Sequence, residues 1–239
     1  MEIKLRNSPE KILTLLLIVV ACLVIFNSVG QMIRFLTGHG KIFGFVPLFH
    51  LNQEGNIPTW FSSGILFIAG ALAGMIALIK GKMEDTYYLY WIGLCGVFIF
   101  LSADEAASIH ETISEPLRKL NLGGLLYYTW IAPASILVFF MGLIYLKFFW
   151  SLPKRTKILF IISAALFLTG ALVVESIGGY LDDQSGRDTP VYELFSGIEE
   201  TLEMLGVSIF IYSLLDYMKI EFGNFRIRLI SDKSDLDDG

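Results

Sequence analysis

The sequence predicts an all-α integral membrane protein, a polytopic bundle of six transmembrane helices with both termini in the cytoplasm. Of its 239 residues, 54% are hydrophobic and only 17% are charged, and the mean hydropathy is +0.63. These values lie far on the apolar side of soluble domains. The apolar residues fall into six blocks, each close to the ~20 residues that a helix needs to cross ~30 Å of hydrocarbon. We therefore expect the lipid bilayer to surround nearly the whole chain.

The six predicted helices cover residues 12–33, 60–79, 87–113, 125–150, 157–178 and 191–220. They form one transmembrane domain, residues 1–220, which is followed by a polar cytoplasmic tail, residues 221–239. All six are predicted as helices because a spanning segment must satisfy its backbone hydrogen bonds internally.

The first two helices are marked by their flanking residues. A cleaved signal peptide is the alternative for the first, since basic residues precede it and Ser28-Val29-Gly30 resembles a cleavage site. We favour an uncleaved helix because apolar residues resume after that point. The second begins near Pro58, where Asn56 or Thr59 suits a helix start. Its Gly70–Gly74 stripe predicts close helix packing, with a homo-oligomer contact as the alternative.

The other four helices are marked by apolar runs and by their breaks. The third is apolar from Tyr87 and turns polar in its second half. Pro133 predicts a kink in the fourth helix, and Gly178-Gly179 predicts the end of the fifth. The sixth combines an acidic first half with an apolar run over residues 205–220.

The distribution of basic residues predicts the orientation. Of the 18 Lys and Arg residues, 13 fall on the side of both termini, and the positive-inside rule therefore places the termini in the cytoplasm. The five on the outer side are Arg34, Lys41, Arg118, Lys119 and Arg187. The formal net charge of −5 argues against binding to nucleic acid.

A long loop, residues 35–59, precedes the second helix on the outer side. Its length and its aromatic residues place it over the outer mouth of the bundle, either as an interfacial loop or as a lid. His39 and His50 in this loop are expected to contact solvent or lipid headgroups.

Carboxylates are concentrated on the outer side, where 13 of the 23 Asp and Glu residues fall, most of them within helices. At 1.5 Å per residue, Asp104, Glu175 and Glu203 come to a similar depth, just inside the outer leaflet. A carboxylate at that depth is costly unless it faces the bundle interior, carries a proton or binds a cation. These acids are therefore candidates for a functional site.

Helical spacing predicts which acids share a face. At about 100° per residue, the four glutamates of residues 193–203 share one face, about 120° wide, of the sixth helix. On a regular third helix, Asp104, His110 and Glu111 look toward one neighbouring helix. Glu105 and Ser108 lie on another arc, so we expect them to support the site through contacts between helices.

Few basic residues lie near these acids, so a bound divalent metal ion is one way to neutralise them. Oxygen ligands with one imidazole favour Zn, Mn, Fe, Mg or Ca. The predicted ligands are Asp104, His110, Glu111, Glu175, Glu199, Glu200 and Glu203. Glu111 and Glu200 are the predicted catalytic residues, as general bases toward bound water. A network of protonated or Arg-paired acids and a proton or cation pathway are the alternatives.

The leading functional prediction is metal-assisted hydrolysis or group transfer on a lipid headgroup or another small-molecule substrate of the outer leaflet. A proton- or cation-coupled transporter that uses the same carboxylates is the first alternative, and a non-catalytic membrane assembly factor is the second. The transporter requires a polar path to the cytoplasmic side, and the inner halves of the helices offer little beyond Asn27, Ser163 and Asp216.

Two resemblances involve the third helix. The string Ser102–Glu111, of the form S-x-D-E-x4-H-E, together with Asn56–Ser62 resembles a set of uncharacterised bacterial multi-pass membrane proteins. That resemblance implies a bacterial inner-membrane location and no particular activity. The inventory of Ser, Asp and His also resembles the ceramidase and progestin-receptor-like superfamily of intramembrane zinc hydrolases. The paired His-x-x-x-His of that superfamily is absent here, so neither zinc nor amidase activity carries over.

Overall fold

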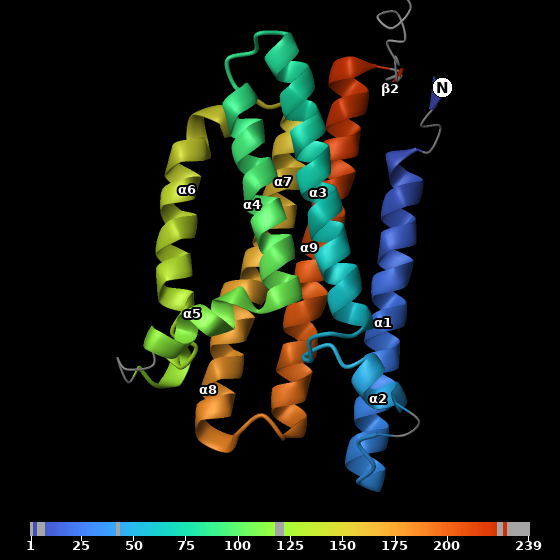
Figure 1. Cartoon of the computed structure of the whole chain (residues 1–239), viewed down its shortest axis with the longest axis vertical. Helices are drawn as coiled ribbons and strands as arrows, with labels where there is room; N and C mark the ends of the chain where they lie inside the picture. Colours follow the sequence, from blue (N-terminus) through green and yellow to red (C-terminus); the bar gives the residue numbers. More distant parts are fainter. Residues whose placement is uncertain (1, 4–7, 42–43, 118–121, 224–226, 229–239) are drawn as a thin grey trace, which may run out of the picture.

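The computed structural model describes residues 2–3, 8–41, 44–117, 122–223 and 227–228, and these are helical apart from one pair of two-residue strands (Figure 1). The elements in chain order are β1 Glu2–Ile3, α1 Pro9–Thr37, α2 Phe45–Leu48, α3 Ile57–Lys82, α4 Tyr88–Ala107, α5 Ile109–Leu117, η3 Gly124–Leu126, α6 Ile131–Ser151, α7 Lys154–Leu168, η4 Thr169–Val174, α8 Glu175–Ser185, α9 Pro190–Phe222 and β2 Ile227–Arg228. η3 is a 3₁₀ turn and η4 is a π-helical segment.

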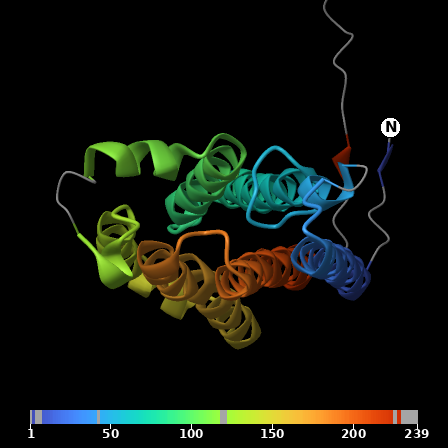
Figure 2. The ribbon, with the colours of Figure 1, turned by 90° about the horizontal axis from the view of Figure 1, so that it is seen from below.

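Five helices of the described chain are long and apolar enough to cross a membrane: Pro9–Thr37, Ile57–Lys82, Tyr88–Ala107, Ile131–Ser151 and Lys154–Ser185. The last joins α7, η4 and α8 into one helix. The sixth predicted span is also helical, as α9, but it is not among these five. α9 packs against α1, α3, α7 and α8, and Figure 2 shows it between α1, α3 and α7. α9, the helix that carries Glu193, Glu199, Glu200 and Glu203, is thus the one most enclosed by other helices.

The core is apolar and lies along α9. The largest fully buried side chains include Ile76 of α3, Trp91 of α4 and Met204, Ile211 and Leu214 of α9. Large apolar side chains are also exposed on the outside of the bundle, as α6 shows with Leu137, Phe139, Phe140 and Ile144. Helices that are apolar on every face are typical of proteins surrounded by lipid.

The two ends of the bundle differ in their connections (Figure 1). The N-terminus, the C-terminal end of α9 and the α3–α4 turn lie at one end, and α2, α5 and the α8–α9 turn lie at the other. The second end therefore carries α2, which belongs to the predicted outer loop, residues 35–59, and the turn that precedes the sixth predicted helix. We refer to it below as the outer end.

The start of α3 and its glycine stripe follow the predictions. Asn56 caps α3, because its side-chain oxygen accepts a hydrogen bond from the Thr59 N–H at 3.1 Å. A Cβ at Gly70 would lie 3.0 Å from Ile99 Cδ1, and one at Gly74 would lie 3.1 Å from Cys95 Sγ. Both glycines therefore serve the close packing of α3 on α4 within one chain.

The prediction of one continuous third helix over residues 87–113 is wrong, because the helix breaks at Ser108. α4 ends at Ala107, Ser108 adopts the left-handed conformation with φ 49°, and α5 begins at Ile109. α5 then runs across the outer end rather than along the bundle (Figure 1). The angles of a regular helix therefore do not hold beyond residue 107. Serine rarely adopts this conformation, so the sequence carried no signal for the break.

The fourth and fifth helices also differ from their predicted bounds. The fourth starts at Ile131, after the separate 3₁₀ turn η3, rather than at residue 125. The fifth continues through Gly178 and Gly179 to Ser185, so the predicted stop at these glycines is wrong. A Cβ at Gly179 would lie 3.1 Å from Tyr128 Cδ2, so this glycine makes room for a neighbouring ring. Of the predicted tail, the described part comprises the last turn of α9, Gly223 and β2.

Candidate acidic site

Asp104 and His110 form a pair across the break between α4 and α5. The His110 backbone N–H donates to Asp104 Oδ1 at 2.7 Å, and His110 Nδ1 lies 3.0 Å from Asp104 Oδ2. A carboxylate that accepts the Nδ1–H of a neutral imidazole leaves Nε2 as the basic nitrogen. The same carboxylate therefore shapes the chain at the break and fixes the tautomer and orientation of the ring.

Trp130 connects this pair to α8. Its ring centroid lies 5.0 Å from that of His110, and its Nε1–H donates to Glu175 Oε1 at 3.0 Å. Glu175 is buried, with 9% of its surface exposed. The structure thus brings two predicted ligands, His110 and Glu175, into contact with one indole. Trp130 was not predicted as a site residue, because an isolated tryptophan near the start of a span is typical of an interfacial residue.

A second group of acids lies between α4 and α9. Glu199, Glu200 and Glu203 each interact electrostatically with Glu105. Glu105 also interacts with Glu54, Asp104 and His110, and it hydrogen-bonds to Ser62 of α3. Glu105, which was predicted only to support the site, therefore lies next to the Asp104–His110 pair and to the three glutamates of α9. Ser108, assigned to the same arc, donates a hydrogen bond to Glu54 of the outer loop.

Two glycines lie where the acidic face of α9 meets the fifth helix, and Gly170 is the one that the close approach requires. A Cβ at Gly170, within the π-helical segment η4, would lie 2.8 Å from the Glu199 carbonyl oxygen and 3.0 Å from Glu203 Cγ. A Cβ at Gly178 would lie 3.8 Å from Glu199 Oε2. π-helical segments within α-helices occur frequently at functional sites. The spacing of these glycines was the available sequence signal for this contact.

The metal centre with seven ligands is not assembled around one point in the part of the chain that the structure describes. As the described side chains are arranged, no three His, Cys, Asp or Glu side chains stand together in a way that would hold a metal ion. Glu111 lies in α5, and its side chain is outside the described residues. Of the remaining six, Asp104, His110 and Glu175 are linked through the His110–Asp104 pair and Trp130, and Glu199, Glu200 and Glu203 lie near Glu105. The two sets also interact electrostatically, Glu175 with Glu199 and Glu200, and Asp104 with Glu203.

Basic residues at the outer end pair with other acids. Arg34 Nη1 donates to Glu193 Oε1 at 2.9 Å, and Arg34 also pairs with Asp188. Arg187 Nε donates to Asp182 Oδ2 at 2.9 Å. Within the described residues, no Lys or Arg forms an ion pair with the second acidic group, Glu105, Glu199, Glu200 and Glu203. In the part of the chain that the structure describes, Lys and Arg therefore do not balance any negative charge that these four glutamates carry.

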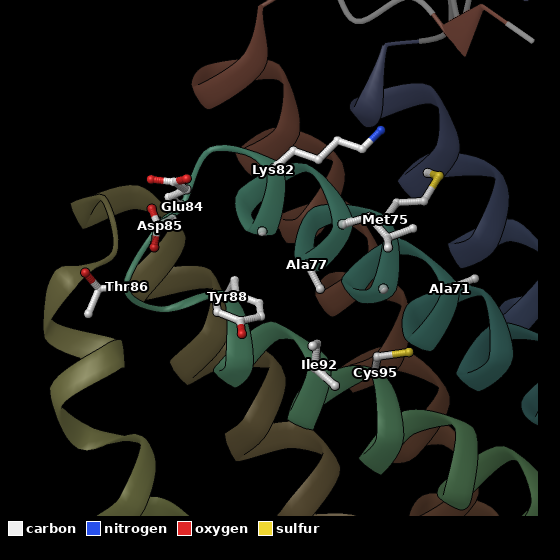
Figure 3. A pocket seen from close by; sticks show the side chains of 13 residues that line it. Ala71, Met75, Ala77, Lys82, Glu84, Asp85, Thr86, Tyr88, Ile92 and Cys95 are labelled. Atoms are coloured by element: carbon white, nitrogen blue, oxygen red, sulfur yellow. The ribbon is translucent and has the colours of Figure 1, made fainter. Parts of the chain in front are cut away.

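A cavity of about 1040 Å³ lies far from these acids, between the inner parts of α3 and α4 (Figure 3). Its walls are apolar over most of their length, with Ala71, Met75 and Ile92, and Lys82 and Asp85 lie at its polar end. It lacks the converging polar groups of a catalytic pocket. We therefore place the candidate site at the acids of the outer end.

Comparison with curated proteins finds no match, and comparison with solved structures finds none either. A family model does match: residues 13–217 correspond to a domain of unknown function, DUF8692. The match covers α1 to most of α9 and therefore includes both acidic groups. The chain thus belongs to the DUF8692 family.

Proposed function

We propose that this protein is a six-span enzyme of the bacterial inner membrane that performs metal-assisted hydrolysis or group transfer at its outer end. The substrate is a lipid headgroup or another small molecule of the outer leaflet. The observation that carries the proposal is the Asp104–His110 pair beside four glutamates that form no ion pair with Lys or Arg among the described residues.

The pair suits general acid–base catalysis. Asp104 orients the imidazole through Nδ1 at 3.0 Å and holds the His110 backbone N–H at 2.7 Å, so both the ring and its main-chain anchor are held by one carboxylate. An imidazole held by a carboxylate in this way serves as a proton acceptor and donor in many hydrolases. A positioned base of this kind typically contributes 10²–10⁴-fold to a rate.

The four glutamates supply the second element of the proposal, a cation site. Carboxylates inside a bundle require a proton or a cation when basic side chains do not pair with them. Glutamate side chains rotate about three bonds, so Glu199, Glu200 and Glu203 can turn toward an ion that approaches Glu105. A divalent ion there would polarise a substrate oxygen or lower the pKa of bound water.

An enzyme of the outer end is favoured over a proton- or cation-coupled carrier by what lies below the acids. The next turns of α9 bury Met204, Val207, Ile211 and Leu214, which form an apolar layer. Asp216, further along α9, pairs with Arg155 Nε at 2.9 Å. Between Met204 and Asp216 the buried polar groups of α9 are hydroxyls, those of Ser208, Tyr212 and Ser213, whereas a proton or cation carrier requires charged or readily titrated groups along its path.

The paired ends of the chain support α9 as the sixth span. β1 pairs antiparallel with β2, with Glu2 opposite Arg228 and Ile3 opposite Ile227. This pairing is what the proposed topology requires, in which the segments before α1 and after α9 lie on one side of the membrane. An even number of crossings is needed for that arrangement, and the five apolar helices alone would put the ends on opposite sides. The enclosure of α9 by other helices explains how it tolerates its acids.

The test uses the full-length protein in proteoliposomes. Released phosphate, ethanolamine and choline are measured with and without added divalent ions, and bound metal is measured by mass spectrometry of the purified protein. Glu203→Gln should lower bound metal and activity together, and His110→Gln should lower activity. Glu84→Gln, at the opposite end, is the matched control and should change neither. A wild-type protein that binds no metal and releases no headgroup under any of these conditions would refute the proposal.

A further inference from the structure

A second cavity, of about 230 Å³, lies at the outer end and is polar. We call it the outer cavity, and its lining residues are Arg34, His50, Asn52, Gln53, Arg187, Asp188 and Glu193. None of them belongs to the two acidic groups of the proposed enzyme site. Glu193 lies seven residues before Glu200, or about 10 Å along α9. The outer cavity is therefore a separate place on the molecule.

His50 is the observation that points to a ligand. Its exposed fraction is 3%, so the expectation that it contacts solvent or headgroups freely is wrong. It lines the outer cavity, and neither ring nitrogen forms a hydrogen bond among the described residues, although Nε2 lies 3.3 Å from Glu193 Oε1. Gln31 accepts a hydrogen bond from Arg34, and its own Nε2 is buried without a hydrogen-bond partner among the described residues. Buried polar groups are rarely left in this state unless a further molecule satisfies them.

The charges of the outer cavity indicate what that molecule carries. Two guanidinium groups and two carboxylates line it, and Arg34 pairs with both carboxylates while Arg187 pairs with Asp182. A ligand with a single charge would bind one member of such a pair and leave the other, such as the buried Glu193, without its partner, which is costly. A ligand with both signs would place its anionic group at the guanidinium groups and its cationic group at the carboxylates. The cavity is thus suited to a zwitterion.

The size and position of the outer cavity narrow the class of ligand. Since a water molecule occupies about 30 Å³ of the liquid, the outer cavity has room for roughly seven or eight groups of that size. Phe35 and Leu36, next to Arg34, are exposed apolar residues, as expected where the first predicted span leaves the membrane. At that level the available small zwitterions include phospholipid headgroups.

We propose that the outer cavity binds a phosphoethanolamine group, with the phosphoryl oxygens at Arg34 and Arg187 and the ammonium at Asp188 and Glu193. His50 Nδ1 and the side-chain amides of Asn52 and Gln53 provide further hydrogen-bonding groups around it. The group is carried by a lipid or by the free compound, since the two share this chemistry. The binding does not depend on the enzyme activity proposed above.

Soluble probes test the chemistry with full-length protein in detergent. Radiolabelled O-phosphoethanolamine should bind, and phosphocholine should bind at least tenfold more weakly because its methyl groups replace the three N–H donors. Inorganic phosphate alone and ethanolamine alone should also bind at least tenfold more weakly, because each brings an unbalanced charge. Equal binding of phosphate alone, or no binding of phosphoethanolamine at millimolar concentration, would overturn the proposal.

Variants locate the binding. His50→Gln and Arg187→Gln should each weaken phosphoethanolamine binding about tenfold or more. Asp188→Asn should also weaken binding, and because Asp188 is exposed this variant should not disturb the fold. His39→Gln and Asp183→Asn, at exposed outer residues that do not line the outer cavity, should bind like the wild type. Equal losses in the two sets would overturn the assignment to this cavity.

A nanodisc experiment separates the two sources. Wild-type protein and His50→Gln are extracted from nanodiscs that contain phosphatidylethanolamine and phosphatidylcholine, and native mass spectrometry measures the retained lipid. Retention of phosphatidylethanolamine by the wild type alone identifies a lipid-borne group. Binding of the soluble probe without lipid retention identifies the free compound, and either result supports the proposal.

Discussion

The carboxylate of Asp104 holds His110 twice, by its backbone N–H at 2.7 Å and by its ring Nδ1 at 3.0 Å. The two residues are six positions apart, a separation at which side chains on a regular helix do not meet on one face. Their contact exists because Ser108 reverses the local backbone. The chain break and the acid–base pair are therefore one structural feature.

Asp104→Asn should uncouple this pair. An amide oxygen still accepts a hydrogen bond but no longer stabilises a protonated imidazole, so we expect turnover of the proposed reaction to fall about 10²–10⁴-fold. ¹⁵N NMR of labelled histidine should show the Nδ1–H tautomer of His110 in the wild type and a mixture in the variant. Unchanged tautomer and turnover would show that Asp104 acts on the backbone alone.

Gly170→Ala should destabilise the fold. The added Cβ would lie 2.8 Å from a backbone oxygen of α9, which cannot move away by a side-chain rotation, so we expect a loss of about 1–3 kcal/mol. Gly142→Ala in α6 meets no atom within 4 Å and should be neutral or gain up to about 1 kcal/mol. Unfolding in detergent, followed by circular dichroism, measures both. A neutral Gly170→Ala would mean that α9 and η4 pack less closely.

Asp85 should make stability depend on pH at the α3–α4 turn. Burial alone would raise the pKa of its carboxyl, but the Tyr87 N–H at 2.8 Å and Lys80 Nζ at 3.1 Å hold the pKa below the ordinary value. The stabilisation is therefore present above the unfolded-state pKa of about 4 and is lost as the pH falls through the lower folded-state pKa. Asp85→Asn should melt at a lower temperature than wild type at pH 7, and the gap should narrow below about pH 4. A gap that is constant with pH would contradict this account.

The membrane orientation can be tested with fusions. A reporter that is active only in the periplasm should be silent after Gly239 and active when inserted near Gly186, because the proposed six-span topology puts 13 of the 18 basic residues on the side of the termini. A cytoplasmic reporter should give the opposite pattern. Periplasmic activity at both positions would contradict the pairing of the chain ends and the six spans together.

The helical class could be predicted from the sequence because apolar runs of spanning length leave few alternatives. The start of α3 could also be predicted from the sequence, since Asn56 before Pro58 is a strong capping pattern. The end of the third span was not, because the left-handed conformation falls on a serine rather than on a glycine.

Grouping of the acids was predictable only in part. The depth of Asp104, Glu175 and Glu203 along their helices could be predicted, because it depends only on the helical rise per residue. Which side chains meet depends on helix rotation and on breaks, so the roles of Trp130, Gly170 and Glu105 came from the tertiary structure alone. The burial of His50 depends in the same way on how the loop folds back over α9.

The π-helical segment also decides how the fifth helix responds to a change in length. A π-turn holds one residue more than an α-turn, and an extra residue would otherwise rotate everything after it by about 100°. Removing one residue between Thr169 and Val174 should convert the segment to ordinary α-helix and leave Glu175 facing Trp130. The same deletion within α7 should turn Glu175 away from the indole, so two helical stretches of one span differ in their tolerance of a lost residue.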